Sequence, residues 1–409
     1  MKGLGERILT THVGSLCRPA ALLEMVIDRT AGNPVDQAAF EALIAGSIKD
    51  VVAKQAEVGI DIPSDGEFSK PDFHNYILNR LGGLEAQSQP AQPVRAGSKG
   101  MYYPKLAEEF PRFMEQYGGM YRTMWLPPEI PAEKVQAALK VSIPRTTVTG
   151  PITYVGQAEL KRDLDNFGAA LAGHDFADAF VPSVTPSRYD AFSDDIYTSE
   201  KDYLYALADA MHEEYKAIVD AGYMVQLDLG LPSRNQVLPG IPHPSVDDLR
   251  RASELQVEAY NHALRGIPTE RVRYHMCWGS MNTPHTTDVP LKDLLDLILK
   301  IDAKYYVIEG ANPRHEHEWM VWKDIKLPDD KILVPGMVSH QTNVVEHPEL
   351  VSWRIQNYAS VVGRDRVIAG TDCGFSQGWT MMRVHEEVQW AKLRSLAEGA
   401  ALASKALWQ

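Results

Sequence analysis

Short apolar runs alternate with longer amphipathic stretches along this chain of 409 residues. The short runs have the length of buried strands, and the longer stretches repeat apolar residues at helical spacing. The alternation favours an α/β fold of the TIM (β/α)8 barrel type. A doubly wound sheet is the alternative, although no Gly-x-Gly-x-x-Gly turn follows the first predicted strand. Predicted strands cover 8–13, 148–152, 224–228, 272–277, 305–309, 332–337 and 367–369, and predicted helices cover 40–58, 201–221, 246–264, 291–301 and 349–362.

One segment, about 88–144, interrupts this alternation with many proline, tyrosine and tryptophan residues. Loops of such length are usually functional or disordered, and the aromatic content favours a packed structure. We therefore expect residues 1–409 to form a single barrel domain with this insertion over the mouth of the barrel. The alternatives are a passive surface excursion and a contact between the subunits of a homo-oligomer.

Four side chains of metal-binding type stand in or just after predicted strands: His275, Cys277, Glu309 and Cys373. Two thiolates, an imidazole and a carboxylate suit four-coordinate Zn²⁺, and the carboxylate is the ligand that an incoming thiol displaces most easily. His275 and Cys277 are separated by one residue, so an extended strand presents both on the same face. The set predicts a catalytic zinc site rather than a structural one.

The spacing of the two cysteines is unlike that of a small structural zinc site, whose ligands come in close pairs. Cys277 and Cys373 are 96 residues apart, so they meet only if the fold brings distant strand ends together. Taken singly, each candidate ligand has a plainer interpretation as a core residue, because free cysteine is among the most buried residue types.

Short segments around these residues follow one another in an order that resembles a known family. Together they resemble the cobalamin-independent methionine synthase family, specifically its C-terminal catalytic barrel, and the resemblance covers nearly the whole chain. The segments are Leu9-Thr-Thr-His-Val-Gly-Ser, Asp65-Gly-Glu-Phe, Thr149-Gly-Pro-Ile-Thr, Val225-Gln-Leu-Asp, His275-Met-Cys, Glu309 and Asp372-Cys-Gly.

The resemblance implies roles for further residues. It implies that zinc is bound by His275, Cys277, Glu309 and Cys373, the same four residues that the ligand chemistry selects.

It also implies that Ser15, Glu67 and Asp228 hold the amino-acid end of a thiol substrate. His340, which follows a predicted strand, would handle a proton on the leaving group of the methyl donor.

Two more residues are candidates for substrate contact. His12 lies in the opening strand close to Ser15, and Arg234 follows the Val225-Gln-Leu-Asp segment in a loop where it could meet an anionic group. An ordinary surface arginine is the alternative for Arg234.

The chain also departs from the family pattern. Full-length members have two barrels, whereas 409 residues accommodate one. Asp228 is followed by Leu229-Gly-Leu rather than by an acidic residue or Asp-Pro, and the segment after Glu309 is unlike that of methionine synthases. These differences point to the single-barrel branch, which includes epoxyalkane:coenzyme M transferase.

Composition excludes several classes of protein. A formal charge of −13 with no basic stripe argues against a nucleic-acid binder. No apolar run approaches the roughly 20 residues that span a bilayer, so we expect no membrane contact. Three cysteines in a long chain suit a reducing cytoplasm and leave thiols free for a metal.

The expected activity follows from thiol chemistry. A free thiol has a pKa near 8.5, and binding to Zn²⁺ removes its proton. We expect methyl transfer to a thiol such as homocysteine from 5-methyltetrahydrofolate or another donor, such as a methylated corrinoid protein. Alkyl transfer from an epoxide to another thiol, such as coenzyme M, is the first alternative. A metal-free decarboxylase on a related barrel, or a zinc-binding barrel without catalysis, is the second.

Overall fold

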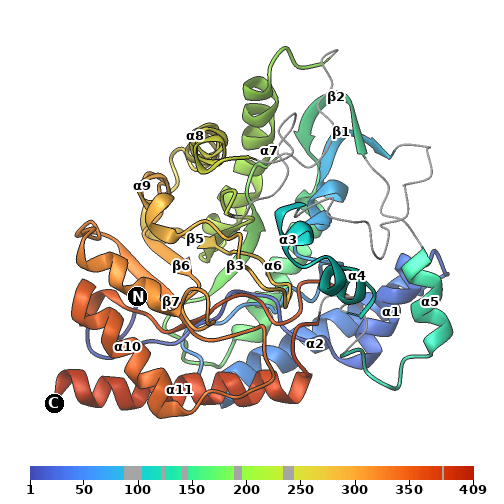
Figure 1. Cartoon of the computed structure of the whole chain (residues 1–409). Helices are drawn as coiled ribbons and strands as arrows, with labels where there is room; N and C mark the ends of the chain where they lie inside the picture. The colour runs from blue at the N-terminus through green and yellow to red at the C-terminus, as the bar shows by residue number, and fades with distance from the viewer. Residues whose placement is uncertain (87–103, 121–124, 141–145, 188–195, 234–243, 380–381) are drawn as a thin grey trace.

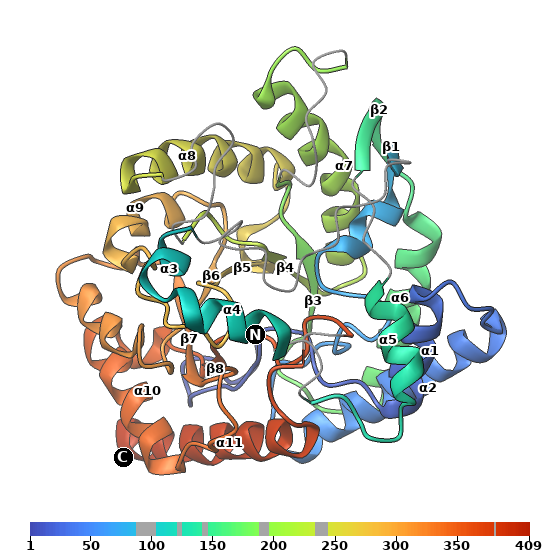
Figure 2. The ribbon, with the colours of Figure 1, turned by 45° about the vertical axis from the view of Figure 1, so that its right-hand side comes forward.

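Six parallel strands in chain order form the main sheet of this computed structural model. The structure describes residues 1–86, 104–120, 125–140, 146–187, 196–233, 244–379 and 382–409. Figure 2 shows the strands following one another along a curve, with helices outside them. The strands are β3 (Phe180–Val184), β4 (Met224–Asp228), β5 (Val272–Met276), β6 (Tyr305–Ile308), β7 (Ile332–Val338) and β8 (Gly370–Thr371).

Helices surround this sheet, and the last of them crosses the base of the molecule in Figure 1. The α-helices are α1 (Ala20–Thr30), α2 (Gln37–Glu57), α3 (Pro104–Glu109), α4 (Pro111–Met120), α5 (Ala132–Lys140), α6 (Gln157–Leu171), α7 (Glu200–Asp220), α8 (Val246–Ala263), α9 (Leu295–Ile298), α10 (Pro348–Val362) and α11 (Glu386–Trp408). Short 3-10 helices are η1 (Asn75–Arg80), η2 (Thr269–Arg271), η3 (Leu291–Asp293), η4 (Glu316–Lys323) and η5 (Arg364–Arg366).

The sequence itself marks where several helices begin and end. α8 starts with a capping box, in which the Ser245 side chain accepts the N–H of Asp248 and the Asp248 side chain accepts the N–H of Ser245. α10 starts with Pro348 in its first turn and ends at Gly363, whose φ of 94° favours glycine. These local signals explain why the predicted helices over 246–264 and 349–362 match the structure closely.

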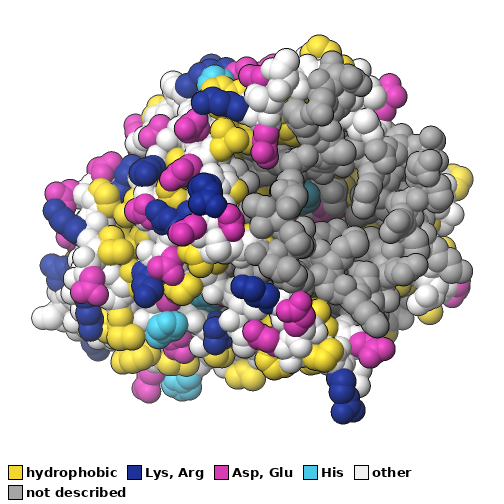
Figure 3. Space-filling model, turned by 45° about the horizontal axis from the view of Figure 1, so that its top comes forward, with side chains coloured by type: hydrophobic (Ala, Val, Ile, Leu, Met, Phe, Trp, Pro, Cys, Tyr) yellow, Lys and Arg dark blue, Asp and Glu magenta, His cyan; other side chains and the backbone are white. Residues whose placement is uncertain are grey.

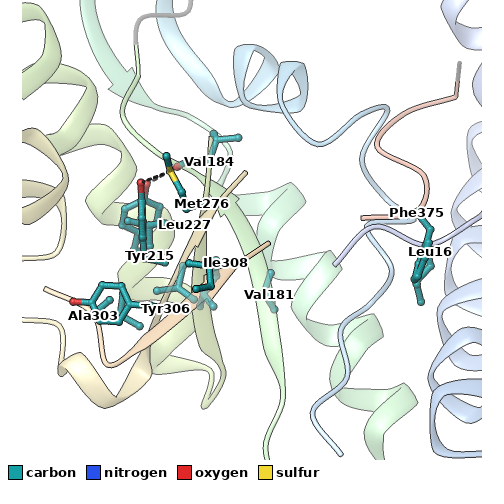
Figure 4. Close-up of a cluster of buried hydrophobic side chains, with 14 of the residues drawn as sticks. Leu16, Val181, Val184, Tyr215, Leu227, Met276, Ala303, Tyr306, Ile308 and Phe375 are labelled. Carbon is teal, nitrogen blue, oxygen red and sulfur yellow. Dashed lines mark hydrogen bonds between the residues drawn. The ribbon is translucent and has the colours of Figure 1, made fainter. Parts of the chain in front are cut away.

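Alternation of side chains gives the main sheet two different faces. On β5, Tyr274 and Met276 belong to the layer that packs against the helices, and Figure 4 draws Met276 within this buried hydrophobic cluster. Successive side chains of a strand point to opposite faces, so Arg273 and His275 point to the other face. That face carries a second apolar cluster, which includes Val307 and Val334.

Two segments near the N-terminus lie against the edges of the sheet. Thr10 forms a parallel bridge with Ala369, and Thr11 forms another with Ile62. The Phe180 N–H, at the start of β3, donates to Pro63 O at 3.1 Å. Residues 8–13 therefore make only isolated bridges, not the full strand that the sequence predicts.

The predicted strand over 148–152 is not part of the main sheet, which corrects the topology predicted from the sequence. It exists as β2 (Thr146–Tyr154), but it pairs antiparallel with β1 (Leu81–Ala86) in a separate two-stranded sheet. β3 was absent from the predicted strands because Pro182 interrupts its apolar pattern. The predicted helix over 291–301 is divided between η3 and α9.

The predicted insertion, about 88–144, is described in part. α3 and α4 lie in front of the main sheet in Figure 2. The Thr286 hydroxyl donates to Glu109 Oε2 at 2.5 Å, so the end of α3 contacts the loop that follows β5. Lys134 of α5 pairs with Glu24 and Asp28 of α1. These contacts attach both described parts of the insertion to the body of the protein.

Acidic and basic side chains are interspersed over the described surface in Figure 3. No helix among the described residues is long and apolar enough to cross a membrane.

A buried ion pair connects α11 to the loop after β7, and it gives a test of the packing. Lys392 Nζ lies 2.8 Å from Glu346 Oε2, and Glu346 Oε1 accepts the Ser339 N–H. We expect Lys392→Met to lower the free energy of unfolding by about 3–5 kcal/mol, because it leaves a buried carboxylate without its cation. Urea denaturation measures this change.

The matched control is Lys161→Met, which breaks the exposed pair with Asp165 and should leave stability nearly unchanged. If Lys392→Met lowers the free energy of unfolding no more than the control does, the buried ion pair does not stabilise the packing of α11.

Candidate metal centre

Three side chains from two distant parts of the chain converge at one end of the main sheet. One ligand atom each of His275, Cys277 and Cys373 lies within 4.8 Å of the other two. His275 is on β5, Cys277 follows that strand directly, and Cys373 follows β8. Because the carboxyl ends of parallel strands lie at the same edge of a sheet, residues 96 positions apart meet here.

The two ring nitrogens of His275 have different surroundings. Nδ1 is 2.7 Å from Asp228 Oδ1, at the end of β4, while Nε2 is buried without a hydrogen-bond partner among the described residues. Burial lowers the pKa of His275, but the hydrogen bond and charge of Asp228 outweigh it and hold the pKa above its usual value. A histidine that is oriented by a carboxylate and keeps its other nitrogen free has the arrangement of a metal ligand.

The two sulfur atoms lie 3.5 Å apart and are not joined by a disulfide bond. Two sulfurs bound to one tetrahedral Zn²⁺ would lie about 3.8 Å apart for Zn–S bonds of about 2.3 Å. The Gly279 N–H donates to Cys277 Sγ at 3.1 Å. The donor set and the unpaired His275 nitrogen therefore fit a zinc ion.

Glu309, the fourth expected ligand, lies outside this group of three. Its Oε1 accepts the Trp278 N–H and its Oε2 accepts the Asn312 amide, both at 2.6 Å. Burial, followed by the charges of Cys277 and Asp372, raises the pKa of Glu309 well above its usual range. Glu309 thus holds the backbone next to Cys277, and its role as a ligand stays a prediction.

Glu67 and Ser15 lie in neighbouring loops, which are joined by the hydrogen bond from the Leu16 N–H to Gly66 O at 3.2 Å. Glu67 has a φ of 61°, which is uncommon for a residue other than glycine, and its Oε2 is buried without a hydrogen-bond partner. Burial raises the pKa of Glu67 to about 7, with Lys70 opposing this and Asp228 adding to it. A Cβ atom on Gly374 would lie 1.9 Å from Ser15 Oγ, so the Cys373 loop and Ser15 pack directly together.

His12 uses both ring nitrogens inside the protein. Nε2 lies 2.7 Å from Gln55 Oε1, and Nδ1 accepts the Gly14 N–H at 3.1 Å. Burial lowers the pKa of His12 to about 3. The ring is therefore neutral and supports the turn at Gly14, and the substrate contact expected for His12 stays a prediction.

His340 follows β7 and is fully buried, and both of its ring nitrogens lack a hydrogen-bond partner among the described residues. Burial, followed by the positive charge of Arg383 and the nearby His285 and His275, lowers its pKa well below 6.5. The ring is neutral near pH 7 and carries one N–H that it can donate. Arg234, the remaining candidate, lies outside the described residues.

A second network of charged groups lies next to the Trp278 ring. Asp288 Oδ2 is 2.8 Å from His285 Nδ1 and 3.0 Å from His315 Nε2, and Glu318 is 2.8 Å from His315 Nδ1. Burial opposes the effect, but these carboxylates raise the pKa of His315 to about 10. The imidazole stacks on Trp278 with 4.3 Å between ring centroids. The sequence feature that indicates this network is an acidic residue three positions after each histidine: Asp288 after His285 and Glu318 after His315.

Two polar residues near the sulfurs were missed by sequence reasoning. Ser280 and Gln377 both donate to Cys373 Sγ, at 3.3 Å and 3.1 Å. The signal that could have found them is proximity in sequence, because Ser280 follows Cys277 by three residues and Gln377 follows Cys373 by four.

The carboxylate of Asp228 gives a test of the metal centre. We expect Asp228→Asn to weaken metal binding about 10–100-fold, because an amide neither fixes the imidazole nor raises its basicity as a carboxylate does. Competition with a chromophoric chelator measures the affinity. Asp209→Asn is the matched control, since Asp209 also bonds a histidine, His262, but at an exposed site. Equal affinities for the two variants would refute a role for Asp228 at the metal.

Comparisons with known proteins agree with these features. The family model described as "Cobalamin-independent synthase, Catalytic domain" matches residues 8–104. A methionine synthase from Saccharolobus solfataricus is 24% identical over 405 residues, which cover 97% of this chain and 95% of that protein. The uncharacterized protein YxjH of Bacillus subtilis is 23% identical over 402 residues, covering 95% of this chain and 92% of that protein.

Solved structures share the fold. A B12-independent methionine synthase from Shewanella, in complex with selenomethionine, aligns over 98% of this chain and 99% of its own, with a TM-score of 0.64 and 17% identity. A putative vitamin-B12 independent methionine synthase from Listeria monocytogenes aligns over 97% of this chain and 98% of its own, with a TM-score of 0.59 and 18% identity. The family model covers residues 8–104, and the relatives and solved structures align over nearly the whole chain, so the protein is similar in sequence and fold to cobalamin-independent methionine synthases.

Proposed function

We propose that this protein is a zinc-dependent methyltransferase that moves a methyl group from 5-methyltetrahydrofolate or another donor to a thiol such as homocysteine. The observation that carries the proposal is the buried, unpartnered Nε2 of His275 beside the sulfurs of Cys277 and Cys373. Relatives described as methionine synthases over nearly the full length support the same reaction.

His275, Cys277 and Cys373 would hold the ion, with Glu309 as the fourth ligand if its side chain turns toward the sulfurs. Bound Zn²⁺ would lower the pKa of a substrate thiol, so that the nucleophilic thiolate exists at neutral pH. Asp228 would keep the His275 ring in place through the 2.7 Å contact with Nδ1.

Glu67 and Ser15 would hold the amino-acid end of the substrate. The carboxylate oxygen Oε2 of Glu67, which is buried without a hydrogen-bond partner, suits an ammonium group. Ser15 Oγ, packed against Gly374, lies on the Cys373 side of the same region.

His340 would act on the methyl donor. In methyl transfer the carbon forms a bond with the thiol sulfur while its bond to the donor breaks, and a nitrogen leaving group then takes up a proton. A neutral, buried imidazole with free ring nitrogens can supply that proton.

The second candidate function is alkyl transfer to a thiol that lacks an amino group, such as coenzyme M. The observation that favours it lies at the end of β4. Asp228 is engaged with His275 and Gln226, and Leu229 follows it with a φ of 63° in place of an acidic residue. Less negative charge is then available to bind a substrate ammonium.

We also propose that the main sheet is part of a closed eight-stranded barrel in a single domain. The bridges of Thr10 and Thr11 and the hydrogen bond from Phe180 to Pro63 support closure, because they link β8 to β3 through residues 9–11 and 61–63. The contact of Thr286 with Glu109 supports the insertion as a cover over the mouth.

The direct test of function is an assay of purified protein with 5-methyltetrahydrofolate and homocysteine. We expect methionine to form, and we expect Cys277→Ser to reduce the rate to background because it removes one sulfur donor. Cys17→Ser is the matched control. Cys17 is buried outside the metal group and donates to Val384 O, so this variant should remain active.

Alkylation of coenzyme M by an epoxide, with no methionine formed, would replace the first function by the second. Activity that persists in Cys277→Ser would contradict both.

The raised pKa of Glu67 predicts a pH dependence of substrate binding. A pKa of about 7 leaves the carboxyl largely protonated at pH 6 and ionised at pH 8, so attraction for an ammonium grows as pH rises. The preference for homocysteine over 2-mercaptoethanol, as a ratio of Kd values, should increase roughly tenfold over this range.

Ionisation of the thiol affects the binding of both homocysteine and 2-mercaptoethanol, so its effect largely cancels in the ratio of their Kd values. Glu67→Gln should make the ratio independent of pH. A ratio in the unaltered protein that is the same at pH 6 and pH 8 would exclude Glu67 as the ammonium partner.

A further inference from the structure

We infer that Gln377, held in place by Arg383, is a positioning residue that hydrogen-bonds the Cys373 sulfur and tunes it as a metal ligand. The inference rests on the proposed function, because it assigns Cys373 to the metal. The inference extends the proposed metal centre to Gln377, which is not itself proposed as a metal ligand.

Gln377 lies four residues after Cys373, directly after two residues that contact the chain at Met382 and Arg383. The Arg383 N–H donates to Phe375 O at 2.8 Å, and Ser376 forms an antiparallel bridge with Met382. The Gln377 side chain is 6% exposed. Its Nε2 lies 3.1 Å from Cys373 Sγ and also donates to Ser280 Oγ.

The orientation of the Gln377 amide is determined by its neighbour. Arg383 Nε donates to Gln377 Oε1 at 3.0 Å. A guanidinium has only donors, so the amide oxygen must face Arg383, and the amide nitrogen must then face the sulfur. The contact with Cys373 Sγ is therefore an N–H···S hydrogen bond.

The backbone of this segment does not depend on the Gln377 side chain. The Phe73 N–H donates to Gln377 O at 2.9 Å, and Asp72 forms an antiparallel bridge with Gly378. The backbone at Gln377 and Gly378 is thus held by main-chain contacts. The amide is directed to the sulfur, to Ser280 and to Arg383, which is the pattern of a group that supports a ligand.

The two sulfurs accept hydrogen bonds from different kinds of group. Cys373 Sγ accepts from Gln377 Nε2 and from Ser280 Oγ, whereas Cys277 Sγ accepts the backbone N–H of Gly279. A donor on a thiolate withdraws electron density from it. Donation from Gln377 therefore lowers the electron-donating power of Cys373, and this donor belongs to a side chain that substitution can remove.

The test loads the purified full-length protein with Co²⁺, which reports sulfur ligands through charge-transfer absorption. We expect Gln377→Leu to shift the sulfur-to-cobalt bands to longer wavelength, because the sulfur electrons rise in energy without the N–H donor. We also expect Co²⁺ affinity to fall about tenfold. Gln377→Glu retains the size of the side chain and a partner for Arg383 but has no N–H to donate, so it should show the same shift if Gln377→Leu folds poorly.

The matched control is Gln341→Leu. Gln341 donates to Gly279 O at 3.0 Å and approaches His285, but it has no contact with either sulfur, so the bands should stay in place. Unchanged bands and affinity in both Gln377 variants would overturn the inference and leave the proposed function standing. Absence of sulfur-to-cobalt bands in the unaltered protein would overturn both.

Discussion

Parallel pairing of strands is the constraint on which the rest of this structure depends. It places the ends of β4, β5, β6 and β8 at one edge, so that side chains from remote parts of the sequence meet. Asp372 illustrates the consequence, because its Oδ1 accepts the N–H groups of Gly310 and Ala311, both at 2.8 Å. The loop after Glu309 and the loop that carries Cys373 are thereby joined, and neither could take its position alone.

Buried acidic groups gather at this edge of the sheet. Glu309 and Asp372 are both buried, and burial raises the pKa of each. His315 supplies a positive charge behind Trp278, but it is shared with Asp288 and Glu318. A divalent ion among His275, Cys277 and Cys373 would balance the negative groups that the fold collects there, and this argument is independent of the resemblance to the family.

Sequence reasoning predicted the elements that have a regular pattern. The strands at 224–228 and 305–309 and the helix at 201–221 agree with β4, β6 and α7 within one residue at each end, because apolar periodicity and capping are local properties. β3 and the antiparallel pairing of β2 could not be predicted in this way. Pro182 disguises the first, and strand partners are set by contacts that are remote in sequence.

In the candidate site too, local sequence patterns predicted some features, whereas contacts between remote residues could not be predicted. His275 and Cys277 could be placed on one face from strand alternation alone, and Cys373 joins them at the sheet edge. The hydrogen bonds that Asp228 and Gln377 form with His275 and Cys373 could be identified only from the fold. X-ray absorption at the zinc edge, before and after homocysteine is added, tests the central claim most directly. We predict about one zinc per chain and one additional sulfur neighbour with homocysteine. Protein that binds no zinc, or zinc whose sulfur neighbours do not change with homocysteine or coenzyme M, would contradict the account.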